Sequence, residues 1–156
     1  MILKGIIDND TVNYKKISMV LEFPSCDFKC DKECGQQVCQ NSALATAPNI
    51  EIGTREICQR YLCNPLTEAI VCQGLEPFDS FDELLRVIKV LRAFRDDDVV
   101  IYTGYNKVEI TTYINQLKPY KNIIIKYGRY IPNQQPHYDE VLGIYLASNN
   151  QYAERL

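Results

Sequence analysis

The chain has 156 residues, of which 46% are hydrophobic and 24% are charged, and its formal net charge is −3. These values are typical of a soluble globular protein and exclude disordered and fibrous chains, so we expect one domain over residues 1–156. Lysine and arginine are scattered, which argues against a nucleic-acid-binding face. Charges at Lys4 and Asp8 interrupt the N-terminal segment, so it predicts neither a signal peptide nor a membrane span, and we expect a cytosolic protein.

Short apolar segments predict a series of buried strands. They are rich in β-branched residues and apolar on both faces, which is typical of strands in a parallel sheet. In chain order they span residues 17–23, 68–73, 99–102, 122–126 and 141–146, and residues 2–7 predict a further edge strand.

Three helices are predicted between these strands, over about 54–62, 80–94 and 107–117. Apolar residues recur at helical spacing in the second, and Ser80 with Glu83 predicts a capping box at its start. The third ends before Pro119. Strands that alternate with helices predict βαβ units and a parallel sheet.

Four of the seven cysteines, Cys26, Cys30, Cys34 and Cys39, lie in the long segment 24–41, which predicts an irregular loop. In a reducing compartment such a cluster indicates a metal rather than disulfides. The chain has one histidine, so the site must be mostly thiolate. The gaps of three, three and four residues differ from the C-x₂-C that zinc knuckles favour, whereas iron–sulfur clusters accept more varied spacing. A cluster, a zinc site and inert thiols all remain open.

The remaining cysteines and the histidine have simpler interpretations. We expect Cys58, Cys63 and Cys72 to be core residues, since they fall in or beside predicted helices and strands. His137 lies in a polar segment and is expected at the surface. Phosphate-binding, dinucleotide-binding and nucleophile-elbow motifs are absent from the sequence.

Two further motifs follow predicted strands. Gly74, Leu75, Glu76 and Pro77 come after strand 68–73, and Tyr102-Thr103-Gly104-Tyr105 ends strand 99–102. Each alone is typical of a turn from a strand into a helix. Loops after successive parallel strands lie side by side on one rim of the sheet, where sites are built. We therefore expect the thiolates, the Glu76 carboxylate and the Tyr102-Thr103 pair to face one pocket.

Together, segment 26–41, the Gly74–Pro77 turn and Tyr102–Tyr105 resemble the activating subunit of anaerobic ribonucleotide reductase, a member of the radical S-adenosylmethionine (radical SAM) superfamily. Tyr127-Gly-Arg-Tyr130 and Ala147-Ser-Asn-Asn-Gln151 are similar to two C-terminal segments of that family. The order and separation of these motifs agree over most of the chain. The resemblance implies an α/β partial (β/α) barrel of about five or six mostly parallel strands.

The resemblance also implies a function. It implies a [4Fe-4S] cluster held by three cysteines, with one iron open for S-adenosylmethionine (SAM). Reductive cleavage of SAM would give methionine and a 5′-deoxyadenosyl radical, and the protein would bind, orient and exclude water. The implied partners are a glycyl-radical enzyme and a reductant such as flavodoxin or ferredoxin. Alternatives are a radical SAM enzyme with another substrate and a zinc-stapled, non-catalytic α/β binding module.

Individual residues carry the resemblance. Cys26 and Cys30 match the first two cluster ligands. The family pattern C-x₃-C-x₂-C leaves Cys34 and Cys39 as candidates for the third, and we favour Cys39, because Gln40-Asn41 resembles the pair after the family's third cysteine. The cofactor-contacting Gly-Gly-Glu-Pro motif is matched by Gly74, Leu75, Glu76 and Pro77, with Leu75 in place of the second glycine. Tyr102 and Thr103 match strand-end residues near the cofactor.

Two departures concern the partner more than the cofactor chemistry. Residues 10–14, Asp-Thr-Val-Asn-Tyr, stand where the family has Gly-Pro-Gly, and Tyr127 replaces the family's aspartate before Gly128-Arg129.

Overall fold

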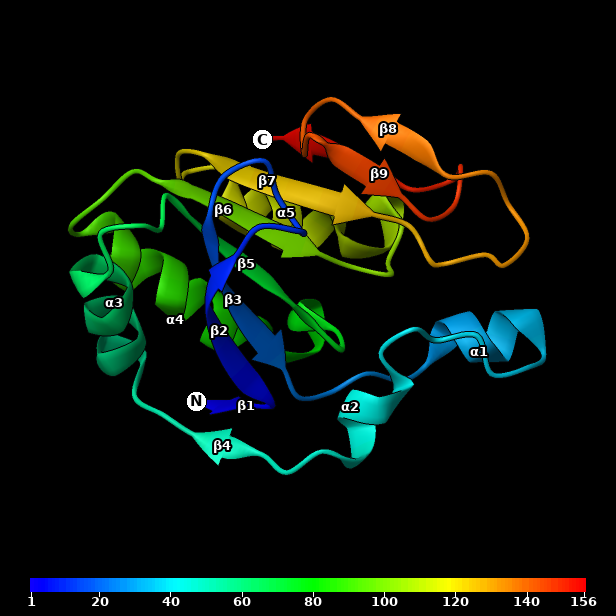
Figure 1. Cartoon of the computed structure of the whole chain (residues 1–156), viewed down its shortest axis with the longest axis horizontal. Helices are drawn as coiled ribbons and strands as arrows, with labels where there is room; N and C mark the ends of the chain where they lie inside the picture. Colours follow the sequence, from blue (N-terminus) through cyan, green and yellow to red (C-terminus); the bar gives the residue numbers. More distant parts are fainter.

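The computed structural model describes all residues, 1–156 (Figure 1). It contains ten strands, five α-helices and two 3-10 helices. The strands are β1 (Ile2–Leu3), β2 (Gly5–Asp10), β3 (Ser18–Phe23), β4 (Ile50–Glu51), β5 (Ala69–Gly74), β6 (Asp98–Tyr102), β7 (Ile123–Tyr127), β8 (His137–Asp139), β9 (Ile144–Leu146) and β10 (Tyr152–Arg155). The helices are α1 (Lys29–Cys34), α2 (Ser42–Thr46), α3 (Thr54–Cys63), η1 (Pro77–Ser80), α4 (Phe81–Arg92), η2 (Lys107–Ile110) and α5 (Thr111–Leu117).

Six strands form one open, mixed sheet in the order β10-β7-β6-β5-β3-β2. The four central strands, β3, β5, β6 and β7, are parallel to one another, and β2 and β10 pair antiparallel at the two edges. The predicted α/β class is confirmed, and the sheet does not close on itself. None of the helices is long and apolar enough to cross a membrane.

The two faces of the sheet are covered differently. Alternate strand residues, such as Leu21, Cys72 and Ile125, pack against α3, α4 and α5 in the larger core. Their neighbours in the strands, such as Val20 and Val71, form a smaller core on the opposite face with Tyr14, Leu142 and Leu146. The helices α3, α4 and α5 thus lie on one side of the sheet (Figure 1). The segment before β3 and the β8–β9 hairpin pack on the other side.

The C-terminal part of the sheet differs from the prediction. Residues 141–146 do not form a strand of the main sheet, because β9 pairs antiparallel with β8 in a separate hairpin. Asp139 turns the chain between them: its Oδ1 accepts the Leu142 N–H at 2.9 Å, and Gly143 has φ +72. The sixth strand is β10, which has no strong strand signal and is held by pairing with β7.

The helices agree with the prediction in position more than in their caps. The 80–94 helix begins as the 3-10 turn η1, and Ser80 makes no side-chain cap hydrogen bond, so the predicted capping box is wrong. The 3-10 turn η1 leads directly into α4, so the helical segment begins at η1. Its cap is Glu76, whose side chain accepts the Phe78 N–H. Cys58 and Cys72 lie in the core as predicted, whereas Cys63 is exposed at the end of α3.

Candidate functional site

The cysteine segment is partly helical, contrary to the predicted loop. Phe28, at φ 54, precedes α1, and Gly35, at φ 66, ends it, so the helix is bounded on both sides by left-handed residues. Asp31 then folds the chain back, because its Oδ1 accepts the N–H groups of Val38 and Cys39 at 2.7 and 2.8 Å. This return brings Cys39 to a cavity that Cys26 and Cys30 also line.

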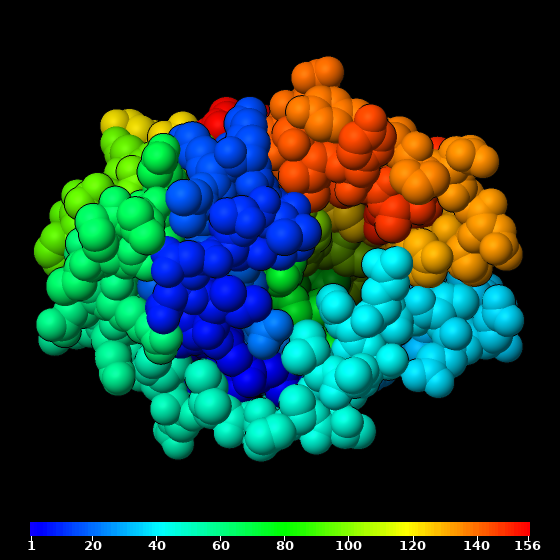
Figure 2. Space-filling view, in the orientation of Figure 1, coloured from blue at the N-terminus to red at the C-terminus, as the bar shows by residue number.

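A cavity of about 340 Å³ opens where the central parallel strands end. The space-filling view shows it as a hollow bounded by the N-terminal segment, the cysteine segment and the β8–β9 hairpin (Figure 2). Its lining includes eight of the residues predicted from the sequence, namely Cys26, Cys30, Cys39, Gly74, Leu75, Glu76, Tyr102 and Thr103. The structure therefore brings the three motifs to one rim.

Two of the predicted residues lie elsewhere. Cys34 lines a second cavity of about 290 Å³, next to Glu33 and Arg129, and does not line the first. Two residues, Cys30 and Tyr130, line both cavities. Pro77 is buried at the start of η1, where its fixed φ suits the first helical position. It shapes the turn rather than the cavity wall.

Glu76 is the acidic group of the cavity and is only 4% exposed. Its Oε2 accepts the Thr103 hydroxyl at 3.0 Å and the Gly104 N–H at 2.9 Å, while Oε1 accepts the Phe78 N–H at 3.1 Å. Burial raises the pKa of its carboxyl to about 7, although these donors act in the opposite direction. No cation pairs with it, so the donors position an acid that is free to meet a ligand.

Gly74 connects the cysteine segment to the Glu76 turn. It has φ +95, and a Cβ there would lie 2.7 Å from the Phe23 nitrogen, so only glycine fits. Its carbonyl accepts the Asn41 side-chain N–H at 2.6 Å, and the Glu76 N–H donates to the Ser25 carbonyl at 2.7 Å. These bonds join the chain on both sides of the cysteines to the end of β5.

Tyr102 and Thr103 play different parts at the end of β6. The Thr103 hydroxyl donates to Glu76 and accepts the Tyr105 N–H at 3.0 Å, so it positions the carboxylate. The Tyr102 hydroxyl instead donates to the Asn13 carbonyl at 2.5 Å. Tyr102 therefore ties segment 10–14, one of the departures from the family pattern, to the wall of the cavity, and Val12 and Asn13 themselves line it.

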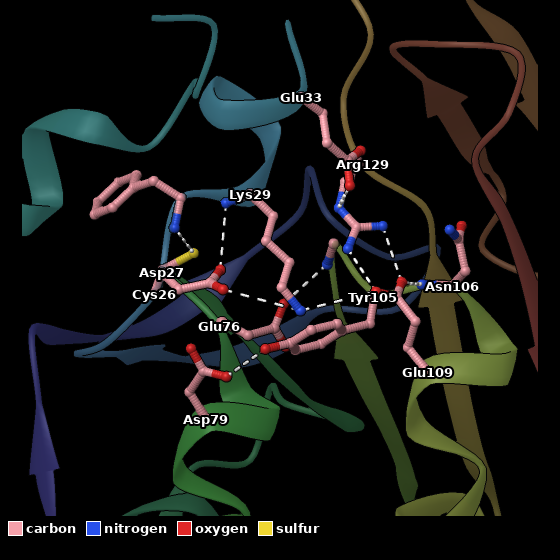
Figure 3. Close-up of polar contacts among 12 residues, drawn as sticks. Cys26, Asp27, Lys29, Glu33, Glu76, Asp79, Tyr105, Asn106, Glu109 and Arg129 are labelled. Atoms are coloured by element: carbon pink, nitrogen blue, oxygen red, sulfur yellow. Dashed lines mark hydrogen bonds and ion pairs between the residues drawn. The ribbon is translucent and has the colours of Figure 1, made fainter. Parts of the chain in front are cut away.

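Outside the cavity, charged side chains hold α1 against the sheet (Figure 3). Arg129 makes a bidentate pair with Glu109, at 2.7 and 2.9 Å, which lowers the Glu109 pKa to about 2. The Arg129 Nε lies 3.2 Å from Glu33 of α1 without an aligned hydrogen bond. Lys29 lies over the Tyr105 ring, 4.2 Å from its centroid, and 3.8 Å from Glu109.

The two C-terminal segments of the resemblance also meet. The Asn150 side chain donates to the Arg129 carbonyl at 2.9 Å, and Gln151 donates to the Gly128 carbonyl at 3.2 Å. Gly128 has φ +98, and a Cβ there would lie 3.0 Å from the Asn150 oxygen. Residues 147–151 thus hold the Gly128-Arg129 turn beside the cavity.

Lys126 is a cavity residue that the sequence analysis missed. It lies in β7, is 7% exposed and lines the cavity, and burial lowers the pKa of its amine to about 8. Its signal in the sequence is a single charge in an otherwise apolar strand, Ile-Ile-Ile-Lys-Tyr. A buried lysine in such a strand is rare without a partner.

The donor set fits an iron–sulfur cluster in its chemistry. Three thiols of one segment face one cavity, and thiolates are the usual ligands of such clusters. Burial raises the pKa of Cys26 to about 11 and also raises that of Cys30, so binding must displace protons from both thiols. No three histidine, cysteine or acidic side chains are gathered closely enough to hold a single ion.

Comparisons with protein-family models, with curated proteins and with solved structures found no match for this chain.

Proposed function

We propose that this protein is a radical SAM enzyme, which holds a [4Fe-4S] cluster through Cys26, Cys30 and Cys39 and binds SAM in the adjoining cavity. The observation that supports this most is that these three thiols line one cavity with Glu76, at the carboxyl ends of four parallel strands. Cofactors bind at this edge in open α/β sheets. The open sheet, with α3, α4 and α5 on one side, is consistent with a partial (β/α) barrel of the radical SAM type.

The proposed reaction is the one-electron reductive cleavage of SAM. When bound, the cluster would supply the electron that breaks the sulfonium bond, which would give methionine and a 5′-deoxyadenosyl radical, and flavodoxin or ferredoxin would restore that electron. The residues of the chain bind and orient. The Glu76 carboxylate, held by Thr103 and Gly104, accepts from the methionine amino group, while the walls around Leu75 and Tyr102 exclude water.

The proposed substrate is a glycyl-radical enzyme such as an anaerobic ribonucleotide reductase. The radical would take a hydrogen atom from a glycine of that enzyme and leave as 5′-deoxyadenosine. The cavity lining includes Val12, 71% exposed, and Tyr145, 72% exposed, so a protein segment can reach it. An anaerobic pull-down that recovers no glycyl-radical enzyme would count against this substrate and favour another one.

The test is electron paramagnetic resonance on protein reconstituted with iron and sulfide under anaerobic conditions and reduced with dithionite. We expect a reduced [4Fe-4S] signal that shifts when SAM is added, because the cofactor would bind next to the cluster. A colourless protein that carries one zinc and shows no cluster signal would refute the proposal and leave a zinc-stapled binding module.

A further inference from the structure

Lys126 is the unpaired one of the two buried cations of this protein. The other, Arg129, pairs with Glu109. The Lys126 Nζ donates only to the Gly128 carbonyl, at 3.1 Å, and no carboxylate lies within ion-pair distance of it. A buried ammonium without an acid is costly, so the cavity it lines is built to receive an anion.

Glu76 supplies the complementary half of this arrangement. It lines the same cavity as Lys126, is also nine-tenths buried or more, and has no cation partner. The two groups form no ion pair with each other, although the Glu76 charge acts on the Lys126 amine through space. One cavity therefore presents a carboxyl group without a cation partner and an ammonium group without an anion partner. Together they suit a ligand that carries both a cationic amine and a carboxylate.

We propose that Lys126 binds the carboxylate of an α-amino-acid group, which Glu76 holds by its amine; this rests on the proposed function, in which that group belongs to SAM. Arg129, the other buried cation nearby, is not available for this role, because Glu109 occupies its guanidinium. Lys126 is thus a binding residue for one end of the ligand. It contributes nothing to the rest of the ligand, the adenosine and the sulfonium.

A different role for Lys126 would be to offset the negative charge of the thiolates. The two roles differ in their dependence on the ligand. A lysine that pairs with the ligand carboxylate loses its effect when the ligand has no carboxylate. A lysine that stabilises the cluster affects every ligand equally, as well as the amount of cluster bound.

The experiment measures binding of two ligands to cluster-loaded protein by equilibrium dialysis, without reductant so that no turnover occurs. The ligands are SAM and its decarboxylated analogue, which keeps the adenosine, the sulfonium and the amine. Wild type is compared with Lys126→Met, Lys126→Gln and Lys126→Arg, and with Lys118→Met as a control, since Lys118 is exposed and away from the cavity. Iron content and far-ultraviolet circular dichroism show that each variant is loaded and folded.

We expect Lys126→Met and Lys126→Gln to raise the Kd for SAM at least about tenfold, with a smaller effect for Lys126→Arg and none for Lys118→Met. The decarboxylated analogue should bind wild type and Lys126→Met alike. Equal losses for both ligands, or unchanged SAM binding, would overturn the assignment. Lys126→Gln keeps a polar group and serves if the methionine variant does not load. Wild type that takes up no cluster or no SAM refutes the proposed function instead.

Discussion

Gly74 occupies the one position where the cysteine segment, the Glu76 turn and the end of β5 meet. We expect Gly74→Ala to destabilise the fold by more than about 3 kcal/mol, because the new Cβ would meet backbone at 2.7 Å in addition to the cost of φ +95. The measurement is urea unfolding of the metal-free protein under reducing conditions.

Gly35 provides the matched control for this substitution. It also has a positive φ, +66, but a Cβ there meets nothing within 4 Å. Gly35→Ala should therefore cost only about 1 kcal/mol, from the left-handed backbone alone. Equal losses for the two variants would show that the close approach of the chain at Gly74 has no energetic consequence.

Glu76 should give the stability of the protein a distinct pH dependence. Its folded-state pKa, about 7, lies above the ordinary value of 4.5, so the folded state holds the proton more tightly than the unfolded state. The resulting stabilisation is complete below pH 4.5 and is lost as the pH rises towards 7 and beyond. From pH 5 to pH 8 we expect this group to lower the free energy of unfolding by about 2 to 3 kcal/mol.

The Glu76→Gln variant isolates this contribution. Urea unfolding at pH 5 and pH 8 should show that the variant gains stability relative to wild type as the pH rises, by the same 2 to 3 kcal/mol. Glu51→Gln, at an exposed position of β4, should follow wild type at both pH values. A constant difference between Glu76→Gln and wild type would mean that Glu76 titrates normally in the fold.

At the scale of elements, the folded-back cysteine segment distinguishes the two candidates for the third ligand. Asp31 directs Cys39 towards the cavity, whereas Cys34, at the end of α1, faces the second cavity. Cys39→Ala should therefore reduce iron after reconstitution from about four per chain to near the metal-free background, and Cys34→Ala should leave it unchanged.

Cys63→Ala is the control, since this thiol is exposed on α3. Iron and sulfide are measured by colorimetry, and the cluster by its absorbance. Loss of the cluster in Cys34→Ala, with retention in Cys39→Ala, would reverse the assignment. Loss in both variants would mean that α1 rearranges when the cluster binds.

At the scale of the whole molecule, local stability is uneven. Neither α1 nor α2 has a buried residue, whereas β5 is buried along nearly its whole length. Segments with few buried contacts open at low free energy. The measurement is hydrogen exchange followed by mass spectrometry. In the metal-free protein, the amide hydrogens of peptides from 27–46 should exchange at least about a hundredfold faster than those of peptides from 69–74.

Cluster loading should slow exchange in 27–46, because ligation ties the segment to the cavity wall, and it should leave peptides from α4 unchanged. Strong protection of 27–46 before loading would contradict this account. It would show that the ion pairs of Arg129 and Lys29 hold α1 as firmly as a packed core does.

Much of the fold follows from local patterns. The four central strands and the helices α3, α4 and α5 lie within a few residues of their predicted positions, because each combines β-branched runs or helical spacing with turn residues at its ends. The residues of the three motifs could also be identified from the sequence, by their residue types and by their positions directly after strands. The placement of Cys39 and Cys34 could not be predicted in this way, since it depends on hydrogen bonds that the Asp31 carboxylate accepts from Val38 and Cys39 across the loop.

Local patterns along the chain were enough to predict the α/β class, the order of the central elements and the residues that end each parallel strand, since these depend on short-range periodicity and composition. Two features became visible only in the folded chain: β10 rather than 141–146 completes the sheet, and Lys126 lies in the cavity without an acidic partner. Both depend on contacts between segments far apart in the chain. The pairing of a weak strand and the partners of a buried charge are set by what surrounds them in space, which no local pattern encodes.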